Sequence, residues 1–390
     1  MTETANGSID GNVDPGFEPV RDAFAANFAE RDEVGAACSV YVDGRAVVDL
    51  WGGVADLDTG RPYDADSLQL VFSTTKGMTA ACICLLAQAG EIDIDAPVAH
   101  YWPGFERTPK AAMPVTWLLT HQAGLPCLDI ELSLDDVLAW DPVIDALERQ
   151  APLWEPGTAH GYHAFTFGHL AGEVVRRVTG QTLGQFFDRE IARPLGLDLW
   201  IGLPREQEPR VAPLVASRAP AQHPASDSLL ARAMLVGPGR AFDPDDVWNR
   251  PEVLRAEVPA GNGVANARSL ARFYAALIGR LDGSSRAPLL DAEHLGVATT
   301  PHASGTDRVL GVESRFGLGF ARSSPSAPAL GGPAGFGHPG AGGSVGFADP
   351  VHRIGFGYVM NRLGDAATPG PSRAERLSRA VYQALGIDIP

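Results

Sequence analysis

Short apolar runs separated by glycine, aspartate and proline mark both ends of the chain. Residues 37–52, ACSVYVDGRAVVDLWG, are typical of two strands joined by a tight turn at Asp43-Gly44. Further short strands with glycine-rich joints are predicted near the C-terminus, at residues 316–321, 344–349 and 353–361. Strands from the two ends that pair with each other would form one antiparallel sheet.

A helical pattern dominates the middle of the chain. GHLAGEVVRRVTG, residues 168–180, has apolar residues at helical spacing and a glycine stop. From Pro204 to Val253 the chain is rich in Pro, Ala and Arg without a clear period, which favours a long loop that shapes a pocket. Helices are predicted at residues 73–88, 115–119, 134–149, 166–179, 183–191, 267–281 (after Asn266 as a cap) and 372–385.

These patterns predict an α+β fold. An antiparallel sheet of N- and C-terminal strands is expected to be flanked by helices, with a mainly helical domain inserted between the two halves of the sheet. The α/β domain would be discontinuous, comprising residues 1–95 and 255–390. The helical domain would comprise residues 96–254, with the pocket-shaping loop near 204–253.

Composition narrows the function classes. The chain has 390 residues, 45% of them apolar and 20% charged, and a formal net charge of −16. So acidic a chain is not expected to bind nucleic acid or an anionic membrane. The N-terminus lacks the basic and apolar regions of a secretory signal, so a cytoplasmic location is expected. The four cysteines lack zinc-site spacing, and neither a metal nor an organic cofactor is expected. The oligomeric state is left open.

One of the chain's two lysines stands three residues after a serine, in Ser73-Thr74-Thr75-Lys76. If Ser73 opens a helix, the two side chains lie on one face and can touch. A serine hydroxyl becomes a good nucleophile when a neighbour takes its proton. Lysine can take it if its pKa falls, whereas arginine stays protonated. Composition alone can also produce such a spacing, so the pair needs further support.

Four stretches, in order, resemble the superfamily of serine β-lactamases and penicillin-binding proteins, and most of all its β-lactamase-like (family VIII) carboxylesterases. They are Ser73–Lys76, TWLLTHQAGLP (Thr116–Pro126), WEPGTAHGYHAFTFGHLAGEVV (Trp154–Val175) and GHPGAGGSVGFADP (Gly337–Pro350). The resemblance covers roughly residues 20–385 and implies a β-lactamase/transpeptidase-like fold.

The resemblance also implies roles for individual residues. Ser73 is similar to the family's nucleophile and Lys76 to its base partner. Tyr162 is similar to the phenol that shares the base role, as a phenolate beside an ammonium, and then protonates the leaving group. The backbone N–H groups of Ser73 and Ala341 are expected to form the oxyanion hole.

Two departures from the family pattern bear on the substrate. Ala164 replaces the Asn of Tyr-x-Asn, and His338-Pro339-Gly340 replaces Lys-Thr-Gly. In lactam-processing members these polar groups hold the substrate's amide side chain and carboxylate. Their loss is expected to weaken the binding of an anionic lactam more than the binding of a neutral ester. His338 and Gly340 are expected to contact substrate, although His338 could also tune Tyr162 or be structural.

The chain contains other candidate residues. Gly342–Gly346 matches G-x-S-x-G, but a turn and a strand rather than a helix are predicted to follow, which argues against Ser344 as nucleophile. His121 is interpreted as structural, and the histidines near Tyr162 lack an acidic partner for a metal. Apolar walls for the acyl or alcohol group, each equally plausible as plain core, are predicted at Trp154, Phe165, Trp248 and Phe336.

The predicted function is hydrolysis of carboxylic esters, with short acyl chains, through an acyl-enzyme on Ser73. An alcohol could replace water, so transesterase activity is open. The alternatives are a β-lactamase or D-amino-acid peptidase on the same scaffold and a catalytically inactive binding protein. The expected partner is a small-molecule ester.

Overall fold

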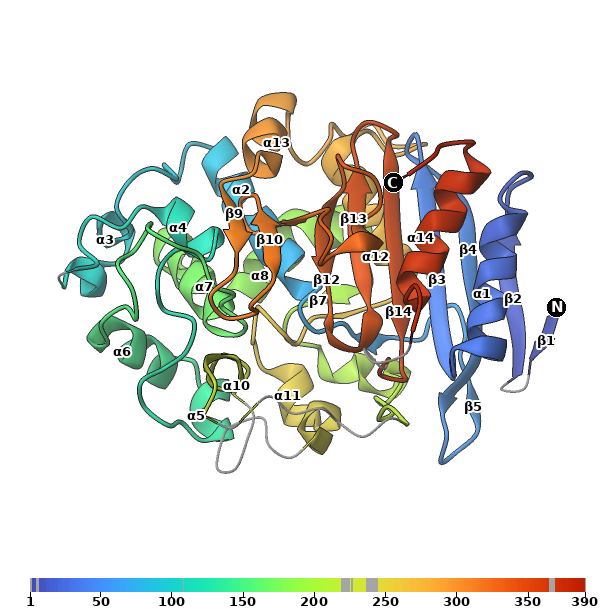
Figure 1. Cartoon of the computed structure of the whole chain (residues 1–390), viewed down its shortest axis with the longest axis horizontal. Coiled ribbons are helices and arrows are strands. Elements are labelled where there is room, and N and C mark those ends of the chain that lie inside the picture. Colours follow the sequence, from blue (N-terminus) through green and yellow to red (C-terminus); the bar gives the residue numbers. More distant parts are fainter. Residues whose placement is uncertain are drawn as a thin grey trace.

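The computed structural model describes residues 2–4, 7–107, 109–218, 225, 227–235, 245–364 and 369–389. Figure 1 shows an antiparallel sheet on one side of the molecule and a mainly helical part on the other. This arrangement confirms the predicted α+β fold of the β-lactamase/transpeptidase type.

Strands from both ends of the chain build the large sheet. Within the described residues its order is β1-β2-β4-β3-β14-β13-β12-β11-β10-β9, and β5 pairs with β4. β3 and β14 join the two ends, with Tyr358 opposite Cys38. The strands are β1 (Thr2–Thr4), β2 (Gly7–Val13), β3 (Gly35–Val42), β4 (Arg45–Asp56), β5 (Arg61–Pro62), β9 (Ala303–Thr306), β10 (Glu313–Phe316), β11 (Ala321–Arg322), β12 (Phe336–Pro339), β13 (Val345–Asp349) and β14 (Ile354–Met360).

Helices cover both faces of this sheet. α1 (Glu18–Glu30) and α14 (Arg373–Ala384) pack side by side on one face (Figure 1). α12 (Ala267–Ile278) packs across β3, β13 and β14 on the other face. The predicted cap at Asn266 is confirmed, because its side chain accepts a hydrogen bond from the first turn of α12. Ser372, predicted as the first residue of a helix, caps α14 in the same way.

The helical part is built around α2 (Thr75–Gln88), which packs against α7 (Thr166–Thr179) and α8 (Leu183–Phe187). A small sheet, β6-β8-β7, lies beside it. The division into two domains stays a prediction. The remaining elements are β6 (Gln69–Leu70), β7 (Leu199–Trp200), β8 (Val264–Ala265), α3 (Val98–Tyr101), η1 (Pro103–Glu106), α4 (Val115–Leu119), α5 (Leu134–Leu138), α6 (Asp141–Arg149), η2 (Asp188–Ala192), α9 (Arg193–Leu195), η3 (Arg205–Arg210), α10 (Leu229–Ala233), η4 (Asp245–Asn249), α11 (Pro251–Arg255), α13 (Ala292–Thr299), η5 (Pro328–Leu330) and η6 (Ala341–Gly343).

Several predicted elements need correction. The helix predicted at 134–149 is two helices, because Trp140 adopts a φ of 70° that a continuous helix excludes. The strand predicted at 316–321 is interrupted, because Gly319 has a φ of 76°. The loop predicted near 204–253 contains the short helices η3, α10, η4 and α11, and residues 219–224, 226 and 236–244 lie outside the described residues.

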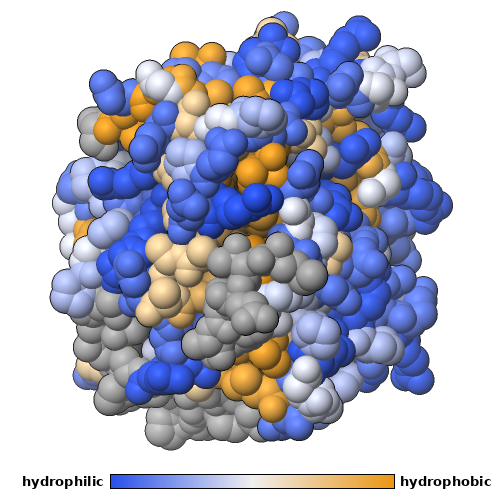
Figure 2. Space-filling model, turned by 90° about the vertical axis from the view of Figure 1, so that its right-hand side faces the viewer, coloured by the Kyte–Doolittle hydropathy of each residue, from blue (hydrophilic) through white to orange (hydrophobic). Residues whose placement is uncertain are grey.

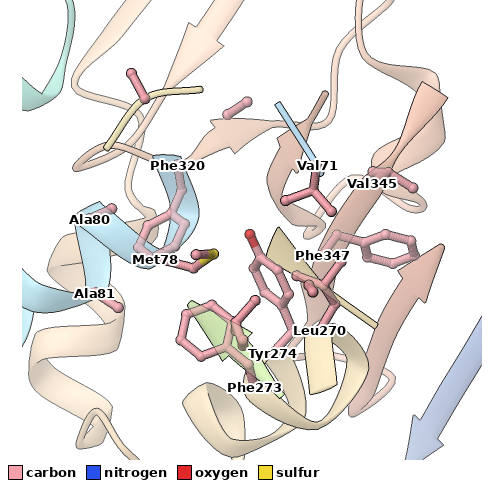
Figure 3. Packing of buried hydrophobic residues seen from close by; sticks show 14 of the residues in the cluster. Val71, Met78, Ala80, Ala81, Leu270, Phe273, Tyr274, Phe320, Val345 and Phe347 are labelled. Carbon is pink, nitrogen blue, oxygen red and sulfur yellow. The ribbon is translucent and has the colours of Figure 1, made fainter. Parts of the chain in front are cut away.

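The core continues from the sheet into the helical part. In Figure 3, Tyr274 of α12 directs its hydroxyl towards the gap between Met78 and Val71, with Phe320 close by. A Cβ atom at Gly77, next to Lys76 on α2, would collide with that hydroxyl. Gly77 therefore allows α2 to sit close to α12.

The end of the molecule at α1 and β2 is mainly hydrophilic on its surface, with hydrophobic side chains in separate patches (Figure 2). Among the described residues, no helix combines the length and the apolar character needed to cross a bilayer.

Candidate active site

Ser73 lies in a turn that leads into α2. The helix begins at Thr75 rather than at the predicted Ser73. Phe72, immediately before the serine, has a φ of 46°, which is uncommon for a residue other than glycine. Such backbone strain at one position is a frequent feature of functional sites. The Lys76 N–H donates to the Ser73 carbonyl at 3.0 Å, so the expected spacing of one turn is kept.

Lys76 is fully buried, and its amine makes three polar contacts. Nζ lies 3.2 Å from Ser73 Oγ, 2.7 Å from the carbonyl oxygen of Ala164 and 2.9 Å from that of Ala260. Both carbonyl oxygens can only accept hydrogen bonds. Ser73 itself is partly exposed, so a substrate can reach the hydroxyl while the amine stays shielded from water.

Tyr162 is the third residue of the site, beside Ser73 and Lys76. Its hydroxyl is hydrogen-bonded to the Ser73 side chain, and the Lys76 amine lies 4.8 Å from the centre of its ring. The structure thus brings together the three polar groups that the sequence singled out. The ring packs against Phe316 and His338, at centroid distances of 6.3 Å and 5.9 Å.

Burial controls the protonation of this group. It lowers the pKa of Lys76 well below its ordinary 10.5, and it raises the pKa of Tyr162 above its ordinary 10.0 despite the hydrogen bond between Tyr162 and Ser73. A neutral amine beside a neutral phenol is therefore favoured in the free site. Burial disfavours each charge of the phenolate–ammonium pair implied by the resemblance, whereas the attraction between the two charges favours it, so this pair stays a prediction.

The loop after β12 comes close to the serine. Gly340 has no room for a side chain, since a Cβ atom there would collide with Val71 O and Ser344 Oγ. The next residue, Ala341, is exposed at the start of η6. Among the hydrogen bonds of the described residues, none uses the backbone N–H of Ser73 or of Ala341. Both donors are thus available, and their role as an oxyanion hole stays a prediction.

His338 is buried and neutral. Burial and the nearby Lys76 lower its pKa to about 3. Its Nδ1–H donates to the Pro339 carbonyl at 2.7 Å, so Nε2 carries a lone pair, and it has no partner among the described residues. The single N–H donor of the neutral imidazole is therefore used within the protein. The ring atom left without a partner is an acceptor.

The four predicted apolar walls separate into three groups. Phe165 and Trp248 stack at 5.8 Å, and Trp248 contacts Phe72 at 5.2 Å, so both lie near the nucleophile's turn. Trp154 donates to the Ala159 carbonyl and packs on His163, which supports the segment that carries Tyr162. The proposed wall at Phe336 is wrong, because this ring is fully buried against Phe320 and Tyr274.

Ser344 is part of the framework. It is fully buried, and its hydroxyl donates to the Val71 carbonyl at 2.8 Å. β13 follows it directly, so the helix that the G-x-S-x-G motif requires does not follow. Within the described part of the chain, no cluster of three or more His, Cys, Asp or Glu side chains could hold a metal ion.

Sequence reasoning missed two groups that build this site. Ala260 supplies a carbonyl to Lys76, and a backbone acceptor leaves no signature in side chains. Asp307 is fully buried and accepts the Tyr162 N–H at 3.0 Å. Asp307 lies in the turn between β9 and β10, and this position is the signal that could have found it. An aspartate buried in a turn needs hydrogen-bond donors around its carboxylate.

The fold and this site define the class: a serine hydrolase on a β-lactamase-type scaffold. Residues 20–379 match the family model described as Beta-lactamase, and the chain belongs to that family.

Similar proteins include esterases. The chain is 39% identical over 374 residues to a Mycobacterium tuberculosis protein named Esterase/beta-lactamase LipL, covering 90% of this chain and 83% of the relative. A crystal structure of a family VIII carboxylesterase is 40% identical, with a TM-score of 0.86, and covers 97% of this chain and all of its own. EstA from Arthrobacter nitroguajacolicus is 35% identical, with a TM-score of 0.88, over 97% of this chain and 99% of its own.

Proposed function

We propose that this chain hydrolyses carboxylic esters, with short acyl chains, through an acyl-enzyme on Ser73. One observation carries the proposal: Lys76 Nζ faces two backbone carbonyls and the Ser73 hydroxyl. A neutral amine has two N–H donors and one lone pair. The carbonyls of Ala164 and Ala260 take the two donors, and the lone pair is left for the proton of Ser73.

Acylation follows from this arrangement. The Ser73 proton moves to Lys76 as Oγ attacks the ester carbonyl carbon. The oxyanion is stabilised by the backbone N–H groups of Ser73 and Ala341. When the C–O bond of the ester breaks, the leaving alcohol takes a proton from Tyr162, and Lys76 restores the Tyr162 proton.

Deacylation repeats the sequence with water. The Lys76–Tyr162 pair accepts a proton as the water oxygen attacks the acyl carbon, and the carboxylic acid leaves as Ser73 Oγ recovers its proton. An alcohol in place of water would give a new ester. Transesterase activity is therefore part of the proposal.

Two departures from the lactam-processing pattern, Ala164 and His338, support an ester rather than a lactam as the substrate. Ala164 contributes only its carbonyl, and Lys76 already occupies it. His338 is neutral and offers an acceptor, so it cannot attract a substrate carboxylate as a lysine would. Relatives named as esterases point in the same direction.

The test is hydrolysis of p-nitrophenyl acetate and butyrate by the wild type and by Ser73→Ala. Loss of the nucleophile should lower kcat by a factor of at least about 10³. A fluorophosphonate probe should label Ser73 and leave Ser344 unmodified. Equal rates in the two proteins would end the proposal, and an unlabelled Ser73 would favour an inactive binding protein.

β-Lactam hydrolysis is the second candidate, favoured by the name of the Mycobacterium tuberculosis relative. It uses the same acyl-enzyme chemistry on a cyclic amide. Rapid turnover of a chromogenic cephalosporin, with little hydrolysis of the p-nitrophenyl esters, would favour it over the esterase.

A further inference from the structure

A cavity of about 470 Å³ lies beyond the loop that follows β12, and its lining does not include Ser73, Lys76 or Tyr162. It is formed where the end of α1, the segment after β14 and the start of α14 meet, on the face of the sheet where α1 and α14 pack together (Figure 1). Gly342 and Gly343 form the wall nearest to Ala341. A cavity of this size accepts a small organic ligand.

Guanidinium groups outnumber carboxylates in the lining of this cavity. Among the described residues, its charged side chains are those of Arg31, Arg218, Arg362, Arg373, Glu30 and Asp32. The whole chain has a formal net charge of −16, so a cluster of arginines is not a consequence of composition. A local excess of positive charge in a concave surface concentrates anions.

The ion pairs of the described residues do not balance these charges. Asp32 Oδ2 is shared by two guanidinium groups, lying 2.7 Å from Arg362 Nη1 and 3.2 Å from Arg218 Nε. Glu30 is already paired with Arg376 at 2.8 Å, outside the lining. Arg31 forms no ion pair with another described residue. Among the described residues, at least one guanidinium is thus left without a carboxylate of its own.

Arg362 gives a second, independent indication. The residue is 8% exposed, and its Nε is buried without a hydrogen-bond partner among the described residues. An unsatisfied donor on a buried cation is costly, and native structures rarely keep one without a function. Arg373, in contrast, is locked in place by Glu33 and by the Arg362 carbonyl. Arg362, Arg31 and Arg218 are the groups open to a ligand.

We propose that this cavity, the arginine cavity, binds a small anion with two or more oxygens, a carboxylate or a phosphate. Guanidinium groups bind such anions through paired N–H···O contacts, which neutral ligands cannot form. The anionic group belongs either to the substrate or to a separate ligand. The cavity wall is tied to the active-site loop, since the Gly364 N–H donates to the Gly342 carbonyl at 2.8 Å.

Binding is tested with inorganic phosphate by titration calorimetry in low-chloride buffer, on the wild type and on Ser73→Ala. One phosphate per chain is expected in both proteins, and affinity should fall with added NaCl. The double variant Arg31→Gln/Arg218→Gln should weaken binding at least about tenfold. Arg353→Gln, which removes an exposed arginine paired with Asp43 elsewhere, is the matched control and should bind as the wild type does.

The source of the anion is tested with two substrates, phenyl acetate and 4-carboxyphenyl acetate. Their hydrolysis is measured by the release of acid. If the substrate carries the anion, the double variant loses kcat/KM for the carboxylate ester at least about tenfold and keeps it for phenyl acetate. If a separate ligand binds, phosphate affinity falls and the ratio of the two esters does not change.

The substrate comparison alone rests on the proposed esterase function. Phosphate binding by Ser73→Ala does not depend on it, so failure of one proposal is distinguishable from failure of the other. The arginine cavity is not an anion site if the wild type and the double variant bind phosphate equally, or not at all, and treat the two esters alike. A thermal melt of each variant identifies one that has not folded, and single Arg31→Gln then replaces the double variant.

Discussion

The buried carboxylate of Asp307 holds the backbone of Tyr162 in place, across 145 positions of sequence. Oδ1 accepts the N–H groups of Tyr162, Val309 and Leu310 at 3.0, 2.8 and 2.9 Å. The turn between β9 and β10 and the segment that carries the phenol are therefore fixed by one oxygen atom.

Asp307→Asn should impair catalysis through the position of Tyr162. The side-chain oxygen of asparagine can still accept the three N–H groups. Its NH₂ group, however, places two donors where Oδ2 now accepts the hydroxyl of Ser314. The expected result is a fall in kcat of about tenfold with little change in KM, and a loss of about 1–3 kcal/mol in the free energy of unfolding. Steady-state kinetics on p-nitrophenyl butyrate and urea titration measure both.

Asp58→Asn, at an exposed turn, is the control and should leave both quantities unchanged. A destabilised Asp307→Asn that keeps the wild-type kcat would show that the carboxylate stabilises the fold without positioning the phenol.

The two lysines of the chain form a natural pair of test and control. Lys110 is as buried as Lys76, and its amine also donates to two carbonyls, those of Leu147 and Glu148, but among the described residues it has no hydrogen bond to a serine. Because arginine stays protonated, Lys76→Arg should lower kcat for p-nitrophenyl butyrate at least about 10³-fold. Lys110→Arg should keep kcat, measured per mole of folded protein. Substantial activity in Lys76→Arg would mean that the amine is not the base.

Much of the fold and the centre of the site could be predicted because they depend on local sequence. The Asp43-Gly44 turn, the cap at Asn266 and the Ser73–Lys76 spacing are each settled within a few residues. The order of the four family stretches then placed Tyr162 beside them. The helix break at Trp140 was missed although Pro142, at the start of α6, is a helix-start signal, and the φ of 70° at Trp140 has no glycine to mark it.

The rest of the site depends on contacts that sequence spacing does not encode. Ala260 acts through its carbonyl, 184 positions from Lys76, and any residue could supply that atom. His338 was expected to contact substrate, and only the geometry shows that the Pro339 carbonyl uses its N–H donor. Phe336 matched the composition of a pocket wall, yet its ring is fully buried against Phe320 and Tyr274.

The pH dependence of ester hydrolysis should reflect burial of the base. Activity needs a neutral Lys76, and the neutral fraction rises as pH increases through a pKa lowered well below 10.5. The value of kcat/KM should therefore rise with pH on the acid side and then level off. Tyr162, whose pKa is raised above 10.0, should not cause a decline below that pH.

Once hydrolysis by Ser73→Ala is subtracted, kcat/KM should rise between pH 8 and 9.5 less steeply than a base with an ordinary amine pKa allows. An amine with an ordinary pKa would give a continuous rise of about tenfold per pH unit over this range. His338 and His163, whose pKa values burial lowers to about 3, should add no step near pH 6.5.

Gly77→Ala should separate α2 from α12 and thereby disturb Lys76. The new Cβ would collide with the Tyr274 hydroxyl, whose direction Figure 3 shows, and the expected loss of stability is about 1–3 kcal/mol. In Gly77→Ala/Tyr274→Phe the colliding atom is gone and the nearest ring carbon lies 3.2 Å from the added Cβ, so most of the loss should be recovered relative to Tyr274→Phe alone. Gly296→Ala in α13, where a Cβ meets nothing within 4 Å, should instead stabilise the protein by up to about 1 kcal/mol. Urea titration of the four variants measures the coupling, and equal losses with and without the Tyr274 hydroxyl would show that the collision is not what excludes alanine.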